Sequence, residues 1–440
     1  MWKALAGGLQ RVVEVVCNCN NSAFRRVQGF VPIRVTLEFL PTRRDIVLRG
    51  GATALLATFE SNRVIWAATP NRPDVSSTAG KTMIRLYAAA VEAMQQPAIN
   101  YPPQPQSWMF QAYIHAVPAN PFDPANSGGL RNGTPALAER VNQIYGAPAA
   151  GTPQEAWKQA ALQCWGSCTH TSPYFTTWHR WYLYYFERIC RAMCKDQTFM
   201  LPYWNYASDK GASLQLPTAF TDPKTRLIFD DRGLGCANPQ GNGPQNVAMN
   251  NGGYMPYSLV TYGPALDAMV IFPSDTAFVP LSDPGYAKLG FTGRLECVPH
   301  DMVHDSVGGW MGNVPSAAGD PLFYVHHCQI DRLYAIWEEK SGVSYNWGTD
   351  ATQPDQNTWK TQPSSFVDEN GTLVQVKLGD AVNTQTLQYG YDTLATPPPA
   401  QIASLRVAPL TAPANRVIRA AMRSNNFTVK SGGASLWRRN

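Results

Sequence analysis

Histidine is confined to three neighbourhoods of this 440-residue chain. This distribution is the sequence feature that most strongly constrains the fold and the function. Six of its seven histidines lie in two segments, 168–183 and 300–332, and the seventh, His115, follows an apolar run that begins at Trp108. Imidazole is the commonest metal ligand in proteins and suits copper, zinc, iron and nickel. The absence of histidine elsewhere indicates that these imidazoles serve a single metal-binding purpose.

The spacing of the downstream histidines places them on helix faces. His300 and His304 are four residues apart, so both rings can point at one ion, although two histidines that merely share a face would give the same pattern. His327 follows on another predicted helix, with Asp331 one turn below it, where a carboxylate could orient an imidazole or an arginine. Three plus three neutral ligands predict two metal ions held between facing helices of a bundle. The upstream trio is His115, His170 and His179.

Two other kinds of metal site fit the sequence less well. A zinc protease needs HExxH with glutamate as the base, but the residue after His300 is Asp301. A carboxylate-rich diiron site would need several acidic ligands, and the helices predicted around the histidines offer only Glu187 and Glu338 in their interiors. Neutral imidazole ligands therefore remain the preferred interpretation.

The rest of the chain predicts a mainly α fold. Apolar residues make up 44% of the sequence, enough for a sizeable core, and charged residues only 15%, against about 25% in typical soluble domains. We expect a four-helix bundle around the metal site, with long irregular loops such as 207–292 and a few short strands, one at 373–377. The helices expected from apolar periodicity are 82–94, 108–117, 136–144, 174–193 and 323–340.

Four motifs carry a family resemblance. The chain reads CTH at 168–170, WHR at 178–180, HDMVH at 300–304 and DPLFYVHHCQIDRLYAIW at 320–337. These resemble the two copper-binding segments of the tyrosinase, catechol oxidase and polyphenol oxidase family. The sequence YGYD at 389–392 is similar to the tyrosine motif that closes that family's catalytic domain. The match covers about residues 70–395, and the combination of motifs is highly specific.

The resemblance implies a type 3 dicopper centre that uses dioxygen as co-substrate. It implies a phenol oxidase that converts o-diphenols to o-quinones and also hydroxylates monophenols, so that the partners are small phenols. A catechol oxidase without the hydroxylation is one alternative. A dioxygen carrier of the hemocyanin type is another, but residues 396–440 are too short to form the domain that shields such carriers. The implied ligands are His115, His170 and His179 for copper A, and His300, His304 and His327 for copper B, with His326 beside them as a non-ligand.

The resemblance also assigns roles around the copper ions. Glu296, four residues before His300, resembles the glutamate that holds a water molecule in the family. Asp301 stands where hydroxylating members often have asparagine and many catechol oxidases have glycine, and its carboxylate could accept from the same water and act as a base. Val314 matches the gate position over copper B. Asp305, like Asp301, follows a copper B ligand, and we expect the pair to make the rim of the substrate pocket negative.

Cysteine adds a further expectation. In fungal-type members the Cys-x-His spacing carries a thioether bond from sulfur to the imidazole carbon, which implies a bond between Cys168 and His170; a free buried thiol is the alternative. Cys164 and Cys168, like Cys190 and Cys194, are four residues apart on predicted helical stretches. Nine cysteines leave at least one outside any disulfide, and sequence alone does not assign the pairs.

The ends of the chain are predicted to lie outside the catalytic domain. Residues 1–69 form an extension, 70–395 the dicopper domain and 396–440 a Pro-rich linker and short tail. Within the extension, residues 42–59 resemble a twin-arginine export signal, which predicts export to the bacterial periplasm or the medium. The alternative is a basic turn before a short helix, in a cytoplasmic protein. No segment reaches the ~20 apolar residues of a membrane span. The net charge of +5 shows no basic run interleaved with aromatics, so we expect no nucleic-acid partner.

Overall fold

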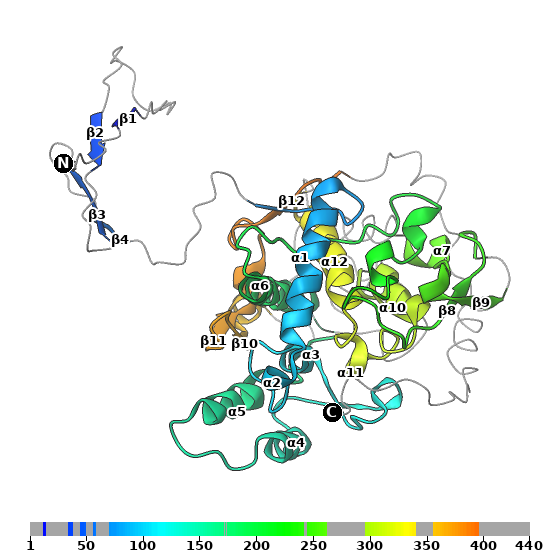
Figure 1. The fold of residues 1–440 in the computed structure, drawn as a ribbon, viewed down its shortest axis with the longest axis horizontal. Coiled ribbons are helices and arrows are strands. Elements are labelled where there is room, and N and C mark those ends of the chain that lie inside the picture. Colours follow the sequence, from blue (N-terminus) through cyan, green and yellow to red (C-terminus); the bar gives the residue numbers. More distant parts are fainter. Residues whose placement is uncertain are drawn as a thin grey trace, which may run out of the picture. The chain divides into compact units, whose positions relative to one another are not determined.

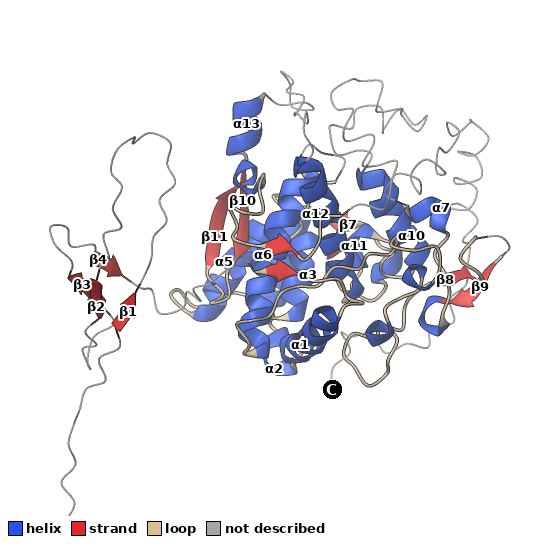
Figure 2. Ribbon diagram, turned by 90° about the horizontal axis from the view of Figure 1, so that it is seen from above, coloured by secondary structure: helices blue, strands red, loops and turns tan. Residues whose placement is uncertain are grey.

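The computed structural model describes residues 70–170, 172, 174–241, 244–261, 295–339 and 355–395, together with four strands in the first 67 residues. The chain divides into two units, 1–67 and 68–440. The first unit holds an antiparallel sheet in the order β1-β2-β3-β4 (Figure 2), with bounds Val12–Glu14, Arg34–Leu37, Asp45–Arg49 and Leu56–Thr58. Strands β3 and β4 occupy part of 42–59, where a short helix was the alternative. The rest of that range lies outside the described residues, so the export signal stays a prediction.

The second unit is mainly helical with long loops, which confirms the predicted fold class. Its strands are short and form two-stranded pairs. None of the helices in the described part of the chain has the length and hydropathy that crossing a bilayer requires. The helices are α1 (Thr78–Met94), α2 (Pro97–Asn100), α3 (Trp108–His115), α4 (Pro135–Tyr145), α5 (Pro153–Cys164), α6 (Phe175–Cys194), α7 (Tyr257–Val260), α10 (Met302–Val307), α11 (Val314–Ala317), α12 (Leu322–Glu339) and α13 (Gln356–Thr361). The strands are β5 (Asn71–Arg72), β6 (Val117–Pro118), β7 (Gly129–Leu130), β8 (Leu234–Cys236), β9 (Gln245–Ala248), β10 (Pro363–Val367), β11 (Leu373–Lys377) and β12 (Gly390–Tyr391).

Side-chain caps explain where several helices begin. Ser77 accepts from the backbone N–H of Gly80, so α1 starts four residues before the predicted position, and Ser107 caps α3 in the same way. Helix α5 starts at a Thr-Pro pair in which Thr152 accepts from Glu155 N–H. Because α5 ends at Cys164, the expectation that Cys164 and Cys168 share a helix is wrong: Cys168 lies in the coil that leads to α6.

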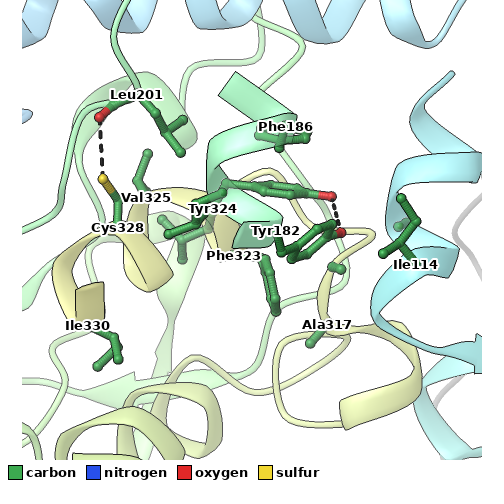
Figure 3. Packing of buried hydrophobic residues seen from close by; sticks show 14 of the residues in the cluster. Ile114, Tyr182, Phe186, Leu201, Ala317, Phe323, Tyr324, Val325, Cys328 and Ile330 are labelled. Atoms are coloured by element: carbon green, nitrogen blue, oxygen red, sulfur yellow. Dashed lines mark hydrogen bonds between the residues drawn. The ribbon is translucent and has the colours of Figure 1, made fainter. Parts of the chain in front are cut away.

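The core lies around α6 and α12, which pack against each other while α1 packs on α6 (Figure 1). Phe186 of α6 stacks on Tyr324 of α12 with ring centroids 3.6 Å apart. The hydroxyls of Tyr182 and Tyr324 are 3.0 Å apart (Figure 3). The Tyr182 hydroxyl donates to the carbonyl of Gln111 on α3, the helix that ends at His115. These buried aromatic contacts fix α3, α6 and α12, three of the histidine-bearing helices, relative to one another.

A buried ionic cluster joins the two ends of the described 70–395 stretch. Strand β5 pairs with β12 in parallel, so Asn71 lies opposite Gly390 and Arg72 opposite Tyr391. The Asp331 carboxylate on α12 accepts hydrogen bonds from four groups that are all buried. Asp331 therefore orients arginines, one of its two predicted roles. We call this set the Asp331 cluster: Arg72, Arg180, Asp331, Tyr389 and Tyr391.

Candidate metal centre

Two clusters of potential metal ligands lie in the second unit. In the first, atoms of His115, Cys168, His170 and His179 all lie within 4.8 Å of one another. His115 ends α3, His179 lies on α6, and the other two come from the coil between α5 and α6. The structure thus brings together the upstream trio that the sequence predicted, and adds the Cys168 sulfur to it.

The second cluster is formed by four histidines. His300 lies in a π-helical turn, Glu296–Asp301, that runs into α10, which carries His304. The remaining two are neighbours on α12. Ligand atoms of all four lie within 4.8 Å of one another. The members are His300, His304, His326 and His327.

The two clusters face each other and form a single centre. The ring of His327 stacks on that of His179, with centroids 4.6 Å apart and an angle of 19° between the planes. The rings of His170 and His300 lie 5.7 Å apart. The ring of His326 lies 5.5 Å from that of His300, 4.8 Å from that of His304 and 5.6 Å from that of Tyr206. Of the two α12 histidines, His327 is thus the one that stacks against the first cluster.

Backbone carbonyls fix the tautomer of two of these imidazoles. His179 Nδ1 lies 2.7 Å from the carbonyl of Phe175, and His304 Nδ1 lies 2.7 Å from that of Met311. A carbonyl oxygen only accepts, so each Nδ1 carries the proton and each Nε2 presents a lone pair. His300 Nδ1 is held by the Asp301 carboxylate at 2.8 Å, which points its Nε2 the same way.

The resulting arrangement of lone pairs fits a metal ion. His304 Nε2 lies 3.2 Å from His327 Nε2, a distance at which two nitrogens can each reach one ion at about 2 Å. Among the described residues, several buried ring nitrogens of both clusters have no hydrogen-bond partner: both nitrogens of His115 and of His326, His300 Nε2 and His327 Nδ1. Buried polar atoms without partners are rare in proteins, and a bound cation would satisfy such nitrogens.

Burial also keeps the imidazoles neutral, as metal ligation requires. It lowers the pKa of His170, His300 and His304 to about 3 each, with neighbouring imidazoles adding to the effect at His170 and His304. Burial, followed by the surrounding histidines, lowers the pKa of His115, His179 and His327 as well. All six are therefore unprotonated at neutral pH and can donate to a metal without losing a proton.

Two phenylalanines position the rings, and neither was predicted to do so. Phe175 lies 4.6 Å from the His179 ring and 4.8 Å from the His300 ring. Phe323 stacks on His327 at 3.9 Å and meets His115 at 4.8 Å. Each phenylalanine precedes a histidine of its own helix by four residues, and this spacing was the sequence signal that could have revealed them.

Comparison with known proteins places the chain in a family. Residues 105–340, more than half of the chain and the part that contains all seven histidines, match the model of the common central domain of tyrosinase. The chain belongs to the tyrosinase family. Residues 356–400 of this tyrosinase-family chain also match the polyphenol oxidase middle domain. The resemblance seen in the copper-segment motifs is confirmed.

Curated relatives are similar over parts of their length. The chain is 31% identical over 321 residues to tyrosinase HcTyr1 of Hahella sp. (strain CCB-MM4), covering 69% of this chain and 59% of the relative. It is 33% identical over 242 residues to the chloroplastic polyphenol oxidase II of Ipomoea batatas, covering 51% of this chain and 39% of the relative. The structure of latent apple tyrosinase aligns with a TM-score of 0.48 at 24% identity, over 78% of this chain and 66% of that one. The chain thus spans between two fifths and three fifths of the curated relatives it matches.

Members of this family hold two copper ions, and the two clusters of this tyrosinase-family chain fit that cofactor. The first cluster offers three imidazoles and the second four, and His179, His300 and His304 present the Nε2 lone pairs described above. The carboxylates that a diiron site would need are engaged elsewhere: Glu187 accepts from Arg72, Arg191 and the backbone N–H of Leu201, and Glu338 accepts from Arg180. The donor set is therefore imidazole, which suits copper in both oxidation states.

The predicted acidic residues lie near the start of the second cluster. Glu296 is 2% exposed. Burial is the main cause that raises the pKa of the Cys168 thiol, and the charge of Glu296 raises it further. Glu296 therefore lies close to the first cluster as well as four residues before His300. Asp301 accepts from His300 Nδ1 and keeps 33% of its side chain exposed. Partial desolvation raises the pKa of Asp301 to about 6 and that of Asp305 to about 6, with Asp301 adding to the latter.

The remaining predicted residues also lie around the centre. Val314 is the first residue of α11 and is 49% exposed. Its backbone lies close enough to His115 to oppose the lowering of the His115 pKa that burial causes. Cys168 Sγ lies 3.4 Å from His170 Nδ1 and 3.4 Å from His179 Nε2. The sulfur thus lies equally close to a nitrogen of the His170 ring, its predicted thioether partner, and to a nitrogen of the His179 ring.

Proposed function

We propose that this chain is a dicopper phenol oxidase that uses dioxygen to oxidise o-diphenols to o-quinones and also hydroxylates monophenols. The observation that carries the proposal is the pair of facing imidazole clusters, in which His179, His300 and His304 each commit Nδ1 to a carbonyl or carboxylate oxygen and leave Nε2 to bind a metal. The names of the relatives, tyrosinase and polyphenol oxidase, support the same chemistry. Small phenols are the proposed substrates.

The ligands we propose are those that the family motifs imply. His327 is preferred to His326 because it stacks on His179 and approaches His304 Nε2, whereas His326 meets only second-cluster rings and Tyr206. When bound, the copper ions would supply electrons to dioxygen in pairs and polarise the phenol oxygen as Lewis acids. The proposed sets are His115, His170 and His179 for copper A, and His300, His304 and His327 for copper B.

Around these ligands the protein fixes geometry and handles protons. Asp301 holds the His300 ring through Nδ1, so the ligand orientation does not depend on the metal. We assign the buried Glu296 carboxylate to hold a water molecule that takes the proton of the phenol hydroxyl, since Glu296 lies four residues before His300 and close to the first cluster. The second Asp301 oxygen would accept from the same water. We infer that this pair of carboxylates supports monophenol hydroxylation.

Two alternatives remain, and one experiment separates them. The full chain is loaded with copper, its copper content is measured, and catechol and then a monophenol alone are added while the quinone absorbance is followed. About two coppers per chain and colour with both substrates support the proposal. Colour with catechol alone would identify a catechol oxidase, and reversible dioxygen binding without colour would identify a carrier. His300→Ala, which removes one proposed ligand, is the matched control and should abolish colour with both substrates.

Two further assignments are proposals. We propose the thioether between Cys168 and His170, formed with loss of one hydrogen from the thiol and one from the ring carbon, dioxygen being the electron acceptor. We also propose export directed by residues 42–59, which fractionation of a bacterial host expressing the wild-type chain and an Arg43→Lys, Arg44→Lys variant would test. Retention of the variant in the cytoplasm with release of the wild type supports it.

A further inference from the structure

The second cluster holds one more imidazole than the proposed copper B set uses. Ligand atoms of four histidines lie within 4.8 Å of one another there, whereas the first cluster consists of three histidines and Cys168. Imidazole nitrogens that bind one ion at about 2 Å each are up to about 4 Å apart, so the four need to approach one another by about 1 Å or less to share an ion. The member without an assigned purpose is His326.

The His326 ring lies among the other second-cluster rings at the separations that proposed ligands have. Its centroid is 4.8 Å from that of His304, 5.2 Å from that of His327 and 5.5 Å from that of His300. The rings of the three proposed copper A ligands are 5.3, 5.4 and 5.8 Å apart. His326 is thus as near to the rest of its cluster as the copper A ligands are to one another, and it is fully buried there.

The ring nitrogens of His326 are not committed to other groups. Neither has a hydrogen-bond partner among the described residues, whereas Nδ1 of His300 and Nδ1 of His304 are each held by an oxygen. A neutral imidazole carries one N–H and one lone pair, so His326 can give its lone pair to an ion without losing a contact. The buried indole N–H of Trp165 also has no partner, but an indole only donates hydrogen bonds and offers no lone pair to a metal.

His326 and His327 differ in how they lie relative to the first cluster. The ring of His327 stacks on that of His179 at 4.6 Å and lies 6.3 Å from that of His115. The ring contacts of His326 are with second-cluster histidines and with Tyr206. An ion that acts together with one in the first cluster has to lie toward His327, whereas a lone ion can lie among all four imidazoles.

We propose that the first copper ion to enter the chain binds in the second cluster with all four imidazoles, and that His326 is a ligand in this one-copper state only. The two-copper centre keeps the sets proposed above, so a chain without His326 still reaches full copper content when copper is in excess. A metal site with four protein ligands is closed, whereas one with three keeps a position for water or substrate. The fourth imidazole therefore keeps a half-loaded chain closed to dioxygen and phenols until the second ion arrives. This inference rests on copper as the metal and not on phenol oxidation.

The test is pulsed electron paramagnetic resonance of the copper-free full chain after addition of Cu(II) well below one equivalent, so that few chains hold two ions. The spectrum counts the imidazoles bound to the ion, and we expect four in the wild type and three in His326→Phe, which keeps an aromatic ring without nitrogens. In competition with a chelator, this variant should bind the first copper at least tenfold more weakly, because losing even a residue that only orients a ligand typically costs about 10–100-fold in metal affinity. The matched control is His115→Phe, at a similarly buried histidine of the first cluster, which should leave the imidazole count and the affinity for the first copper unaltered.

Three results would overturn the proposal. Three imidazoles in the wild type would show that His326 is not a ligand, whether or not the variant folds. A spectrum that changes in His115→Phe but not in His326→Phe would place the first ion in the first cluster. Weaker copper binding by His326→Phe with an unchanged imidazole count would mean that His326 only supports the structure. Because no phenol is added, a chain that fails to oxidise phenols can still give the expected spectrum, so this inference and the proposed function fail separately.

Discussion

Replacing Asp331 with asparagine should destabilise the domain strongly, because it removes the only charge shared by two buried arginines. The side chains of Arg72 and Arg180 are 0% exposed and that of Asp331 is 2% exposed. Asparagine keeps the shape but presents an NH₂ group to partners that all donate, among them the hydroxyls of Tyr389 and Tyr391. Removing one partner of a buried ion pair typically costs about 3–5 kcal/mol.

The expected cost lies at the lower end of that range. Arg72 keeps its contact with Glu187, and Arg180 keeps Glu338, so neither arginine is left without an acidic partner. We therefore expect Asp331→Asn to lower the free energy of unfolding by about 3 kcal/mol, roughly a hundredfold in the folding equilibrium. The m-value should stay unchanged, since the surface exposed on unfolding is the same.

Urea unfolding of the copper-loaded protein, followed by circular dichroism, measures this loss. The matched control is Glu369→Gln, which breaks the ion pair between Glu369 and Arg188. These two side chains are 24% and 31% exposed, respectively. Partly exposed pairs contribute less than about 1 kcal/mol, so the control should unfold almost as the wild type does. A loss for Asp331→Asn no larger than that of Glu369→Gln would refute the argument that this cluster stabilises the domain.

Further predictions concern pH, the metal ligands and substrate choice. Burial alone would raise the pKa of Asp331, but the arginines and the tyrosine hydroxyls hold this pKa below its usual range. The contribution of Asp331 to stability is therefore present above the unfolded pKa of about 4 and is lost as pH falls through the folded pKa. Unfolding curves at several pH values should show that acid destabilises the wild type more than Asp331→Asn. His327→Ala should lose copper while His326→Ala keeps about two per chain, and equal losses by metal analysis would mean the wrong histidine was chosen. If the thioether forms, the peptide containing Cys168 should weigh two hydrogen masses less than expected and resist alkylation, whereas a normally alkylated Cys168 from active protein would exclude the bond. Tyramine should be preferred over 3-(4-hydroxyphenyl)propionate by up to about tenfold in kcat/KM, less at higher salt, and a ratio near one that Asp305→Asn leaves unaltered would remove the acidic rim from substrate selection.

Helix spacing made much of the metal centre predictable from the sequence. Imidazoles at positions 300 and 304 share a face on any helical backbone, and the structure places their rings 4.6 Å apart. The helices around 174–193 and 323–340 were predicted to within one residue at each end, because both are long and strongly periodic. Strand β11 has the predicted bounds, Leu373–Lys377.

Local geometry and distant pairings were beyond that reasoning. The π-helical turn before His300 contains Pro299, which lacks a backbone donor, and a non-helical Val298, so the residues from Glu296 do not continue the regular spacing assumed for them. The contacts of Phe175 and Phe323 with the histidine rings were not predicted.

The pairing of β5 with β12 determines when, during synthesis of the chain, the two ends of the domain can come together. Arg72 and Tyr391, which hydrogen-bond to each other, are separated by 319 positions. A ribosome adds about 5–20 residues per second, so β5 waits roughly 15–60 s after its own synthesis before its partner strand exists. Every proposed copper ligand, the last being His327, is made before that moment. Metal could therefore be captured by a nascent domain whose two ends are still apart, and the final pairing of β5 with β12 would then close a centre already assembled.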